Sequence, residues 1–191
     1  MFFARRPSAD VIGRFLHESQ HLPLSYAEPG LVREASSDPG IDEQVVAIGH
    51  GLADFARARA ALQAWRQFQI GWVELFPANA AIAPGTVVAV RIHHLGFWSL
   101  NGCRVVYQVG GSAHEARFGY AYGTLTNHAE SGEELFEIFS DSGSGDVIYR
   151  IRARSWPRAP LACIGQPIVR ALQARFRRDS AAAMAAAVRG A

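Results

Sequence analysis

The stretch that decides the fold is residues 115–139, EARFGYAYGTLTNHAESGEELFEIF. Its two outer parts, Glu115–Leu125 and Glu133–Phe139, are rich in aromatic and other apolar residues, and the connection between them holds Asn127 and Gly132. Apolar runs bounded by turn-forming residues predict two strands. A parallel pair would need a crossover of about a dozen residues or more. The short connection therefore predicts that the two strands are antiparallel neighbours.

Further strands are predicted on both sides of this pair. Turn-forming residues separate them at Pro84-Gly85, Asn101-Gly102, Gly110-Gly111 and Asp141–Gly145. A short apolar run that ends in Gly49-His50-Gly51 adds one more strand near the start of the chain. Beside the central pair, the predicted strands are Gln44–His50, Ile70–Phe76, Thr86–His94, Cys103–Val109 and Val147–Ser155.

Three helices accompany the strands. A long C-terminal helix is predicted over Ile164–Val188, because apolar residues recur there every four positions. A smaller helix over Ala53–Gln67 places Phe55, Ala58, Leu62 and Trp65 on one face. An N-terminal helix is predicted over Pro7–Gln20 and is followed by a loop, Leu22–Gly40, that is rich in Pro, Gly and Ser.

This order predicts an α+β fold. A curved antiparallel sheet of about seven strands, with the long C-terminal helix across its concave face, hides the apolar surfaces of both. The topology resembles the helix-grip architecture of lipid-transfer and polyketide-cyclase domains. We expect one domain over residues 1–191, with an N-terminal helix and loop over 1–43 and the helix-grip core over 44–191.

Composition excludes several classes of protein. The chain has 191 residues, 49% hydrophobic and 19% charged, so it has enough apolar residues for a folded core. A net charge of +2 does not favour nucleic-acid binding. The two cysteines are too few for a disulfide framework or a four-cysteine zinc site. The sequence shows neither a transmembrane segment nor a secretory leader, so we expect a cytoplasmic protein.

A more specific resemblance rests on Phe118–Leu125, Thr126-Asn127-His128 and Gly132–Phe136, together with Ile151–Ser155 and Gly165-Gln-Pro167. Gly49-His50-Gly51 and Gly71-Trp72 lie upstream of these segments. Together they resemble the family called domain of unknown function nineteen-ninety, over nearly the whole chain. The resemblance implies the same fold, and it implies no reaction, cofactor or catalytic residue.

Candidate chemistry centres on Glu134 and His128. Strand alternation places Glu134 beside Phe136, and a carboxylate on an apolar face has a raised pKa unless it is paired. His128 lies in the preceding turn, where an imidazole near carboxylates suits proton transfer. The alternative is structural: Glu134 pairs with an arginine, and His128 fixes the turn through a backbone hydrogen bond.

Tyrosines mark a candidate ligand-binding surface. Tyr120, Tyr122 and Thr124 share one strand face, and antiparallel pairing brings Tyr122 or Thr124 within reach of Glu134. Tyr149 is a further candidate for this surface, on the strand face opposite an arginine row. That row consists of Arg150, Arg152 and Arg154, and we expect it to pair with Glu133 and Glu137 rather than to bind an anion.

Three functional hypotheses follow. The first is a small-molecule-binding domain that holds an apolar or amphipathic ligand between the sheet and the last helix. The second is an enzyme on the same scaffold that uses Glu134 and His128 as acid and base. The third is a structural or interaction protein with a closed core. No spacing of residues specifies a metal or a cofactor, so none is expected, and the sequence does not decide the oligomeric state.

Overall fold

The computed structural model describes residues 1–33, 40–111, 116–158 and 166–190. Its strands are β1 (Phe2–Phe3), β2 (Asp42–His50), β3 (Val73–Phe76), β4 (Val87–His94), β5 (Phe97–Gly110), β6 (Arg117–Thr124), β7 (Glu130–Ser140) and β8 (Asp146–Pro157). Its helices are α1 (Ala9–Ser19), α2 (Gly51–Gln63), the short 3-10 helix η1 (Arg66–Phe68) and α4 (Gln166–Arg189).

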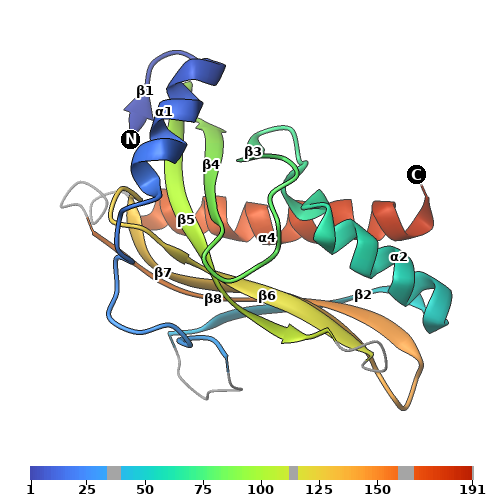
Figure 1. The fold of residues 1–191 in the computed structure, drawn as a ribbon. Helices are drawn as coiled ribbons and strands as arrows, with labels where there is room; N and C mark the ends of the chain where they lie inside the picture. Colours follow the sequence, from blue (N-terminus) through green and yellow to red (C-terminus); the bar gives the residue numbers. More distant parts are fainter. Residues whose placement is uncertain (34–39, 112–115, 159–165, 191) are drawn as a thin grey trace.

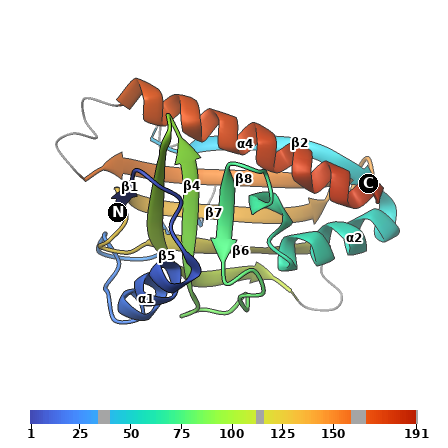
Figure 2. The same ribbon diagram turned by 90° about the horizontal axis from the view of Figure 1, so that it is seen from above.

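The strands form one antiparallel sheet in the order β2-β8-β7-β6-β5-β4-β3, and β1 pairs with β5 beside this path. The sheet is strongly curved, and α4 runs across its concave face (Figure 1). Helix α2 lies beside α4 on the same side (Figure 2). Helix α1 packs on the opposite face of the arm that β4 and β5 form, where Ile12 and Phe15 contact Ala89 and Leu100. The predicted α+β helix-grip arrangement is confirmed.

The main core lies between the concave face and the helices. The largest fully buried side chains there include Trp65, Phe68, Tyr120, Phe136 and Met184. Trp65 directly precedes η1 and packs edge to face on Tyr120. Phe68, in η1, packs edge to face on Phe136. These aromatic side chains occupy the middle of the interface between the sheet and α4.

The predicted helix over Ala53–Gln67 ends too late. α2 stops at Gln63, and Trp65 adopts a left-handed backbone conformation with φ 55° before η1 begins. The predicted inward face is nevertheless confirmed, since Phe55, Ala58, Leu62 and Trp65 are all buried. Because the helix ends before Trp65, the side chains of Trp65 and Phe68 both point into the core.

The predicted turn at Asn101-Gly102 is wrong. Both residues lie inside β5, and the β4–β5 turn is formed by Leu95 and Gly96, at φ 50° and 77°. Positive φ at both central residues is the geometry of a tight hairpin turn. The Asn101 side chain instead donates to Ser99 Oγ at 3.0 Å within the sheet. The strand is therefore longer than predicted and carries the hairpin beyond the main core.

Other boundaries differ by a few residues. α1 is shorter than Pro7–Gln20, and Ser8 caps it by accepting from the amide of Val11. The strand predicted over Ile70–Phe76 begins only at Val73, and that predicted over Glu133–Phe139 begins earlier, at Glu130. The predicted start of the last helix, Ile164, lies outside the described residues.

Candidate functional site

The hairpin of β6 and β7 places Tyr122 directly opposite Glu134. Alternation turns both side chains to the concave face, where the Tyr122 hydroxyl donates to Glu134 Oε2 at 2.7 Å. Tyr122 is buried and Glu134 is half-buried. The predicted proximity of Tyr122 and Glu134 is therefore present, and the two residues form the Tyr122–Glu134 pair.

Helix α4 brings polar side chains at helical spacing to the strands beside this pair. Gln173 Nε2 donates to Ser155 Oγ at 2.9 Å and to the carboxylate of Glu130 at 3.2 Å. Arg177, one turn further along α4, forms an ion pair with Asp42 at 3.4 Å. The site thus combines residues from β2, β6, β7, β8 and α4.

Burial dominates the electrostatics of the site. It raises the pKa of Glu134 to about 7, although the hydrogen bond from Tyr122 and the charge of Arg177 act in the opposite direction. Burial also raises the pKa of Glu130, against the hydrogen bond from Gln173. Within the described part of the chain, neither carboxylate forms an ion pair. Glu134 is therefore able to exchange a proton near neutral pH.

His128 does not join this pair. Its Nδ1 accepts from the backbone amide of Glu130 at 2.9 Å, which closes the turn before β7. Burial lowers the pKa of His128 to about 4, so the imidazole is neutral at pH 7. Among the described residues it makes no hydrogen bond to Glu134. These contacts are those of the structural alternative, in which His128 fixes the turn through a backbone hydrogen bond.

The remaining predicted residues have structural partners. The Tyr120 hydroxyl is hydrogen bonded to Gln67 in the buried core. Tyr149 is fully buried and joins the sheet to α4 through Ser180 Oγ at 2.9 Å. Thr124 Oγ1 accepts from the Gly132 amide at 2.9 Å and so links the ends of β6 and β7. The structure brings Tyr122 and Glu134 together and places Tyr120, Tyr149 and Thr124 in the framework around them.

Two arginines of the row, Arg150 and Arg152, form ion pairs, as predicted for Glu137 but not for Glu133. Arg150 contacts Glu137 at 2.5 Å, and Arg152 contacts Glu43 of β2 at 3.3 Å. Glu133 is bound instead by hydroxyl and amide groups from the N-terminal loop and β5. The prediction failed there because strand alternation does not show which distant loop covers a sheet face.

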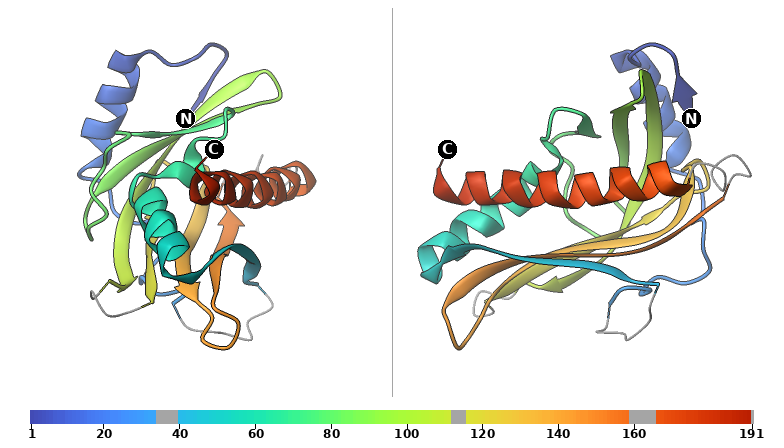
Figure 3. Two further views of the ribbon diagram at one scale, coloured as in Figure 1. Left: turned by 90° about the vertical axis from the view of Figure 1, so that its right-hand side faces the viewer. Right: turned by 180° about the vertical axis from the view of Figure 1, so that it is seen from behind.

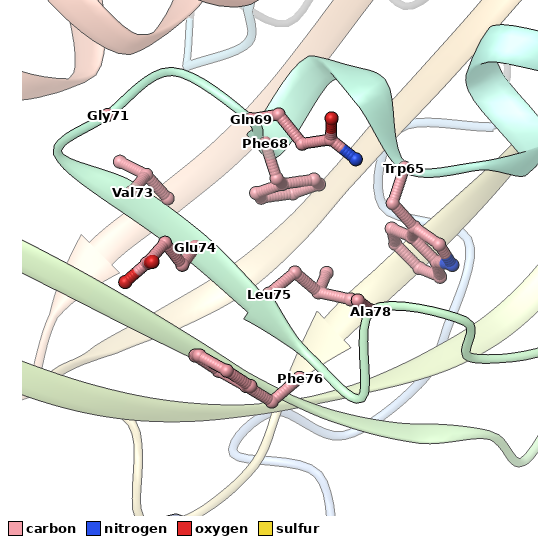
Figure 4. A pocket seen from close by; sticks show the side chains of 9 residues that line it. All are labelled: Trp65, Phe68, Gln69, Gly71, Val73, Glu74, Leu75, Phe76 and Ala78. Carbon is pink, nitrogen blue, oxygen red and sulfur yellow. The ribbon is translucent and has the colours of Figure 1, made fainter. Parts of the chain in front are cut away.

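Two hollows of the described part of the chain lie away from the Tyr122–Glu134 pair. A hollow of about 430 Å³ opens between η1 and the edge strand β3, with Trp65 and Phe68 on one side and Val73 and Leu75 on the other (Figure 4). A second, of about 440 Å³, lies on the convex face beside Arg117, Glu137 and Arg150. The cavity that the ligand hypothesis expects beside Tyr122 and Glu134 therefore stays a prediction.

Sequence reasoning missed Glu130, Gln173 and Arg177. Glu130 was outside the predicted strand, because β7 begins before the apolar run. Gln173 and Arg177 are four residues apart and so share a helix face, which is the sequence signal that could have grouped them. In the described part of the chain, no group of three or more His, Cys, Asp or Glu side chains is placed to hold a metal ion.

Comparison with known proteins identifies the family. The model of a domain of unknown function, DUF1990, matches residues 25–183. The chain belongs to the DUF1990 family. A relative called UPF0548 protein, from Dictyostelium discoideum, is 31% identical over 98% of this chain and 96% of its own length. The match confirms the family that residues 118–136 resemble.

Solved structures share the fold of this DUF1990 member. A protein from Thermus thermophilus aligns with a TM-score of 0.55 and 9% identity, over 78% of this chain and 97% of its own. The Zhui aromatase/cyclase from Streptomyces sp. R1128 aligns with a TM-score of 0.50 and 14% identity, over 78% of this chain and 93% of its own. At such identities the likeness establishes the architecture alone. Among the described helices, none is both long and apolar enough to cross a membrane.

Replacing Glu134 by glutamine is expected to stabilise the protein at pH 8. The folded pKa of about 7 lies above the ordinary value of 4.5, so the unfolded chain ionises first as the pH rises. Wild-type stability is therefore lost progressively from pH 4.5 to 7 through this group. E134Q keeps an acceptor for Tyr122 and cannot ionise, so we expect a gain of about 1–3 kcal/mol at pH 8.

Urea unfolding at pH 4.5 and pH 8 measures this gain. The difference between E134Q and wild type should vanish near pH 4.5, where the carboxyl is largely protonated in the folded state. Glu28→Gln removes an exposed carboxylate and serves as the control for net charge. An E134Q protein that is less stable than wild type at pH 8 would show that Glu134 is held by a structural charge pair.

Proposed function

We propose that this protein binds a small apolar or amphipathic molecule between the concave face of the sheet and the N-terminal half of α4. The observation that carries the proposal is a change in burial along α4. In its C-terminal half the sheet-facing residues Ser180, Met184 and Val188 are buried. In its N-terminal half the corresponding residues Leu172 and Phe176 are only half-buried.

The incomplete burial coincides with the polar pair. Tyr122 and Glu134 of the sheet lie on this side, and Gln173 belongs to this half of α4, so the region offers a carboxylate and an amide beside aromatic surface. A mostly apolar surface with a few polar groups that fix orientation is characteristic of small-molecule sites. Glu134 Oε2 is used by Tyr122, and the other oxygen has no donor among the described residues. A ligand with a hydroxyl or amine group would supply that donor.

Two further observations support binding over the alternatives. Trp65 and Phe68 fill the middle of the interface, so the ligand would occupy its open end rather than a deep cavity. The enzyme hypothesis needs His128 as the partner of Glu134, and His128 is neutral and bound to the backbone of Glu130. The fold is shared with a protein named as an aromatase/cyclase, which agrees with a small-molecule role at the level of architecture only.

The experiment is native mass spectrometry of the purified protein together with titration of the neutral apolar dye Nile red. We expect a retained small molecule or dye binding in the wild type. Leu172→Trp should reduce binding at least about tenfold, because the indole fills the proposed space, a loss equivalent to about 1.4 kcal/mol. Leu52→Trp, at the exposed start of α2, is the matched control and should bind as wild type does.

Three outcomes decide the proposal. Loss of binding in Leu172→Trp with an unchanged thermal midpoint supports the site. Equal binding in Leu172→Trp and wild type would place the ligand elsewhere, for example in the hollow beside β3. No retained molecule and no dye binding in the wild type would favour a structural protein with a closed core.

A further inference from the structure

Exposed apolar side chains gather on the tip of the β4–β5 hairpin and on the adjoining β1. Leu95, in the tight turn, is 70% exposed, and Phe97 is 53% exposed. Phe2 pairs across from Ser99, two residues from Phe97, so alternation puts Phe2 and Phe97 on the same sheet face. Phe2 is also exposed and meets His94 edge to face at 6.3 Å. We call Phe2, Leu95 and Phe97 the hairpin tip.

The hairpin tip has no role in the core. The apolar side chains of β4 and β5 that do build the core, Val88, Val90 and Val105, lie further down the strands. The hairpin extends beyond them and projects from the body of the molecule (Figure 3). Monomeric proteins seldom expose contiguous large apolar side chains without a use for them.

The start of α4 lies at the same end of the molecule as β1 (Figures 1 and 3). It exposes Ile168, and the end of β8 exposes Trp156. Of the large apolar residues exposed elsewhere, Val45 lies in β2 and Leu52 begins α2. Most of the exposed large apolar side chains thus lie at the end of the molecule that holds β1. They belong to the β4–β5 hairpin with β1, and to the start of α4 with the end of β8.

Several arginine side chains lie toward this end. Arg5 follows β1 and Arg170 lies two residues after Ile168, and among the described residues neither forms an ion pair. Arg158, just after β8, donates to the carbonyl of Thr126 rather than to an acid. Arg6 shares the carboxylate of Glu74 with Arg91, so that trio also keeps a net positive charge.

We propose that this end of the protein docks on an anionic lipid surface. Leu95, Phe97 and Phe2 would enter the boundary between headgroups and acyl chains, and Arg5 and Arg170 would lie against the lipid phosphates. Shallow insertion of aromatic and aliphatic side chains, ringed by arginine, is the chemistry by which peripheral proteins bind anionic membranes. The proposal does not depend on the proposed ligand site, because none of these residues lies in the Tyr122–Glu134 pair.

A second copy of the chain fits this surface less well. A twofold dimer places the same patch on both partners, so Arg5 and Arg170 would face a surface with the same positive charge. A projecting turn also presents too narrow an apolar area for a stable flat interface. Both features instead suit a fluid, negatively charged partner.

The test is sedimentation with vesicles of phosphatidylcholine alone and of phosphatidylcholine with about 30% phosphatidylserine. We expect binding to the phosphatidylserine vesicles in 0.1 M NaCl and about tenfold weaker binding in 0.5 M NaCl, because salt screens the arginines. The double variant Leu95→Asn and Phe97→Thr should bind the phosphatidylserine vesicles at least about tenfold more weakly than wild type, a loss equivalent to about 1.4 kcal/mol. Asn tolerates the left-handed conformation of Leu95, and Thr keeps strand propensity, so the hairpin is retained.

The matched control is Leu52→Gln, which removes an 83% exposed leucine away from the proposed surface and should bind vesicles as wild type does. Three results would overturn the proposal. They are no binding of the wild type to phosphatidylserine vesicles, equal binding by the double variant, or a wild-type dimer in ultracentrifugation that the double variant abolishes. Retention of Nile red by the double variant would separate this surface from the ligand site.

Discussion

Replacing Trp65 by alanine is expected to lower the free energy of unfolding by about 3–5 kcal/mol. Trp65 is 1% exposed and packs edge to face on Tyr120, with ring centroids 4.7 Å apart, and on the tilted ring of Phe68 at 5.9 Å. Its indole nitrogen donates to the carbonyl of Ala80 at 2.8 Å. Truncation would leave a cavity at the centre of the interface and an unpaired buried carbonyl. Both effects act in the same direction.

Equilibrium unfolding in urea measures the loss, and two variants separate its causes. Trp65→Phe keeps most of the apolar contact and removes the hydrogen bond to Ala80, so its cost should be about 1–3 kcal/mol. Trp156→Ala removes an exposed tryptophan and should cost about 1 kcal/mol or less. A near-neutral Trp65→Ala would mean that the aromatic side chains do not fill the space between the sheet and α4.

The periodicity of Phe55, Ala58, Leu62 and Trp65 correctly predicted an inward face, although α2 ends before Trp65. A helical pattern reports which side chains face the core, and it is insensitive to a single left-handed residue that keeps the same side chain inward. Trp65 has a positive φ where η1 begins, and its side chain is buried against Tyr120 of the sheet, so tertiary packing accompanies this conformation. Local propensity would not place a tryptophan there.

The Asn101-Gly102 pair is a case in which a local sequence signal predicted the wrong structure. This dipeptide is among the strongest local signals for a hairpin turn, yet the turn lies at Leu95-Gly96. In the structure Gly102 lies against Asn127, and a Cβ at position 102 would overlap the Asn127 side-chain amide unless that side chain moved. Asn101 and Gly102 therefore serve contacts inside the sheet, and a turn signal read from sequence cannot distinguish the two uses.

The candidate site was predictable where it rests on neighbouring strands. The Tyr122–Glu134 contact follows from one short antiparallel hairpin, so alternation and register suffice to predict it. The contacts of Glu130 with Gln173 and of Asp42 with Arg177 join segments far apart in the chain. No periodicity within one segment specifies such pairs, and the path of α4 over β8 and β2 decides them.

Glu133 is expected to make a large contribution to stability, although the sequence favoured Glu134 as the residue of interest. Glu133 is 2% exposed and accepts from the hydroxyls of Tyr26 and Tyr107, each at 2.8 Å. It also accepts from the amides of Gly30 at 2.8 Å and Val32 at 3.4 Å. One carboxylate thus fastens the loop after α1 to the convex face of the sheet.

Replacing Glu133 by glutamine is expected to cost about 2–4 kcal/mol, because the amide NH₂ group turns toward donors and leaves buried groups unpaired. Tyr26→Phe and Tyr107→Phe each remove one donor and should cost about 1 kcal/mol. Glu28→Gln, an exposed position in the same loop, should be close to neutral. Urea unfolding gives these values, and hydrogen exchange reports the loop directly.

The exchange experiment distinguishes a loop anchor from a general loss of stability. In E133Q the amides of Gly30 and Val32 should exchange faster under native conditions, while those in the β6–β7 hairpin keep protection that matches the global stability. A cost below about 1 kcal/mol, or unchanged exchange at Gly30 and Val32, would contradict the role of Glu133 as the anchor. The adjacent residues Glu133 and Glu134 would then differ less than their environments imply. Their side chains lie on opposite strand faces, where the described residues give Glu133 four donors and Glu134 one tyrosine.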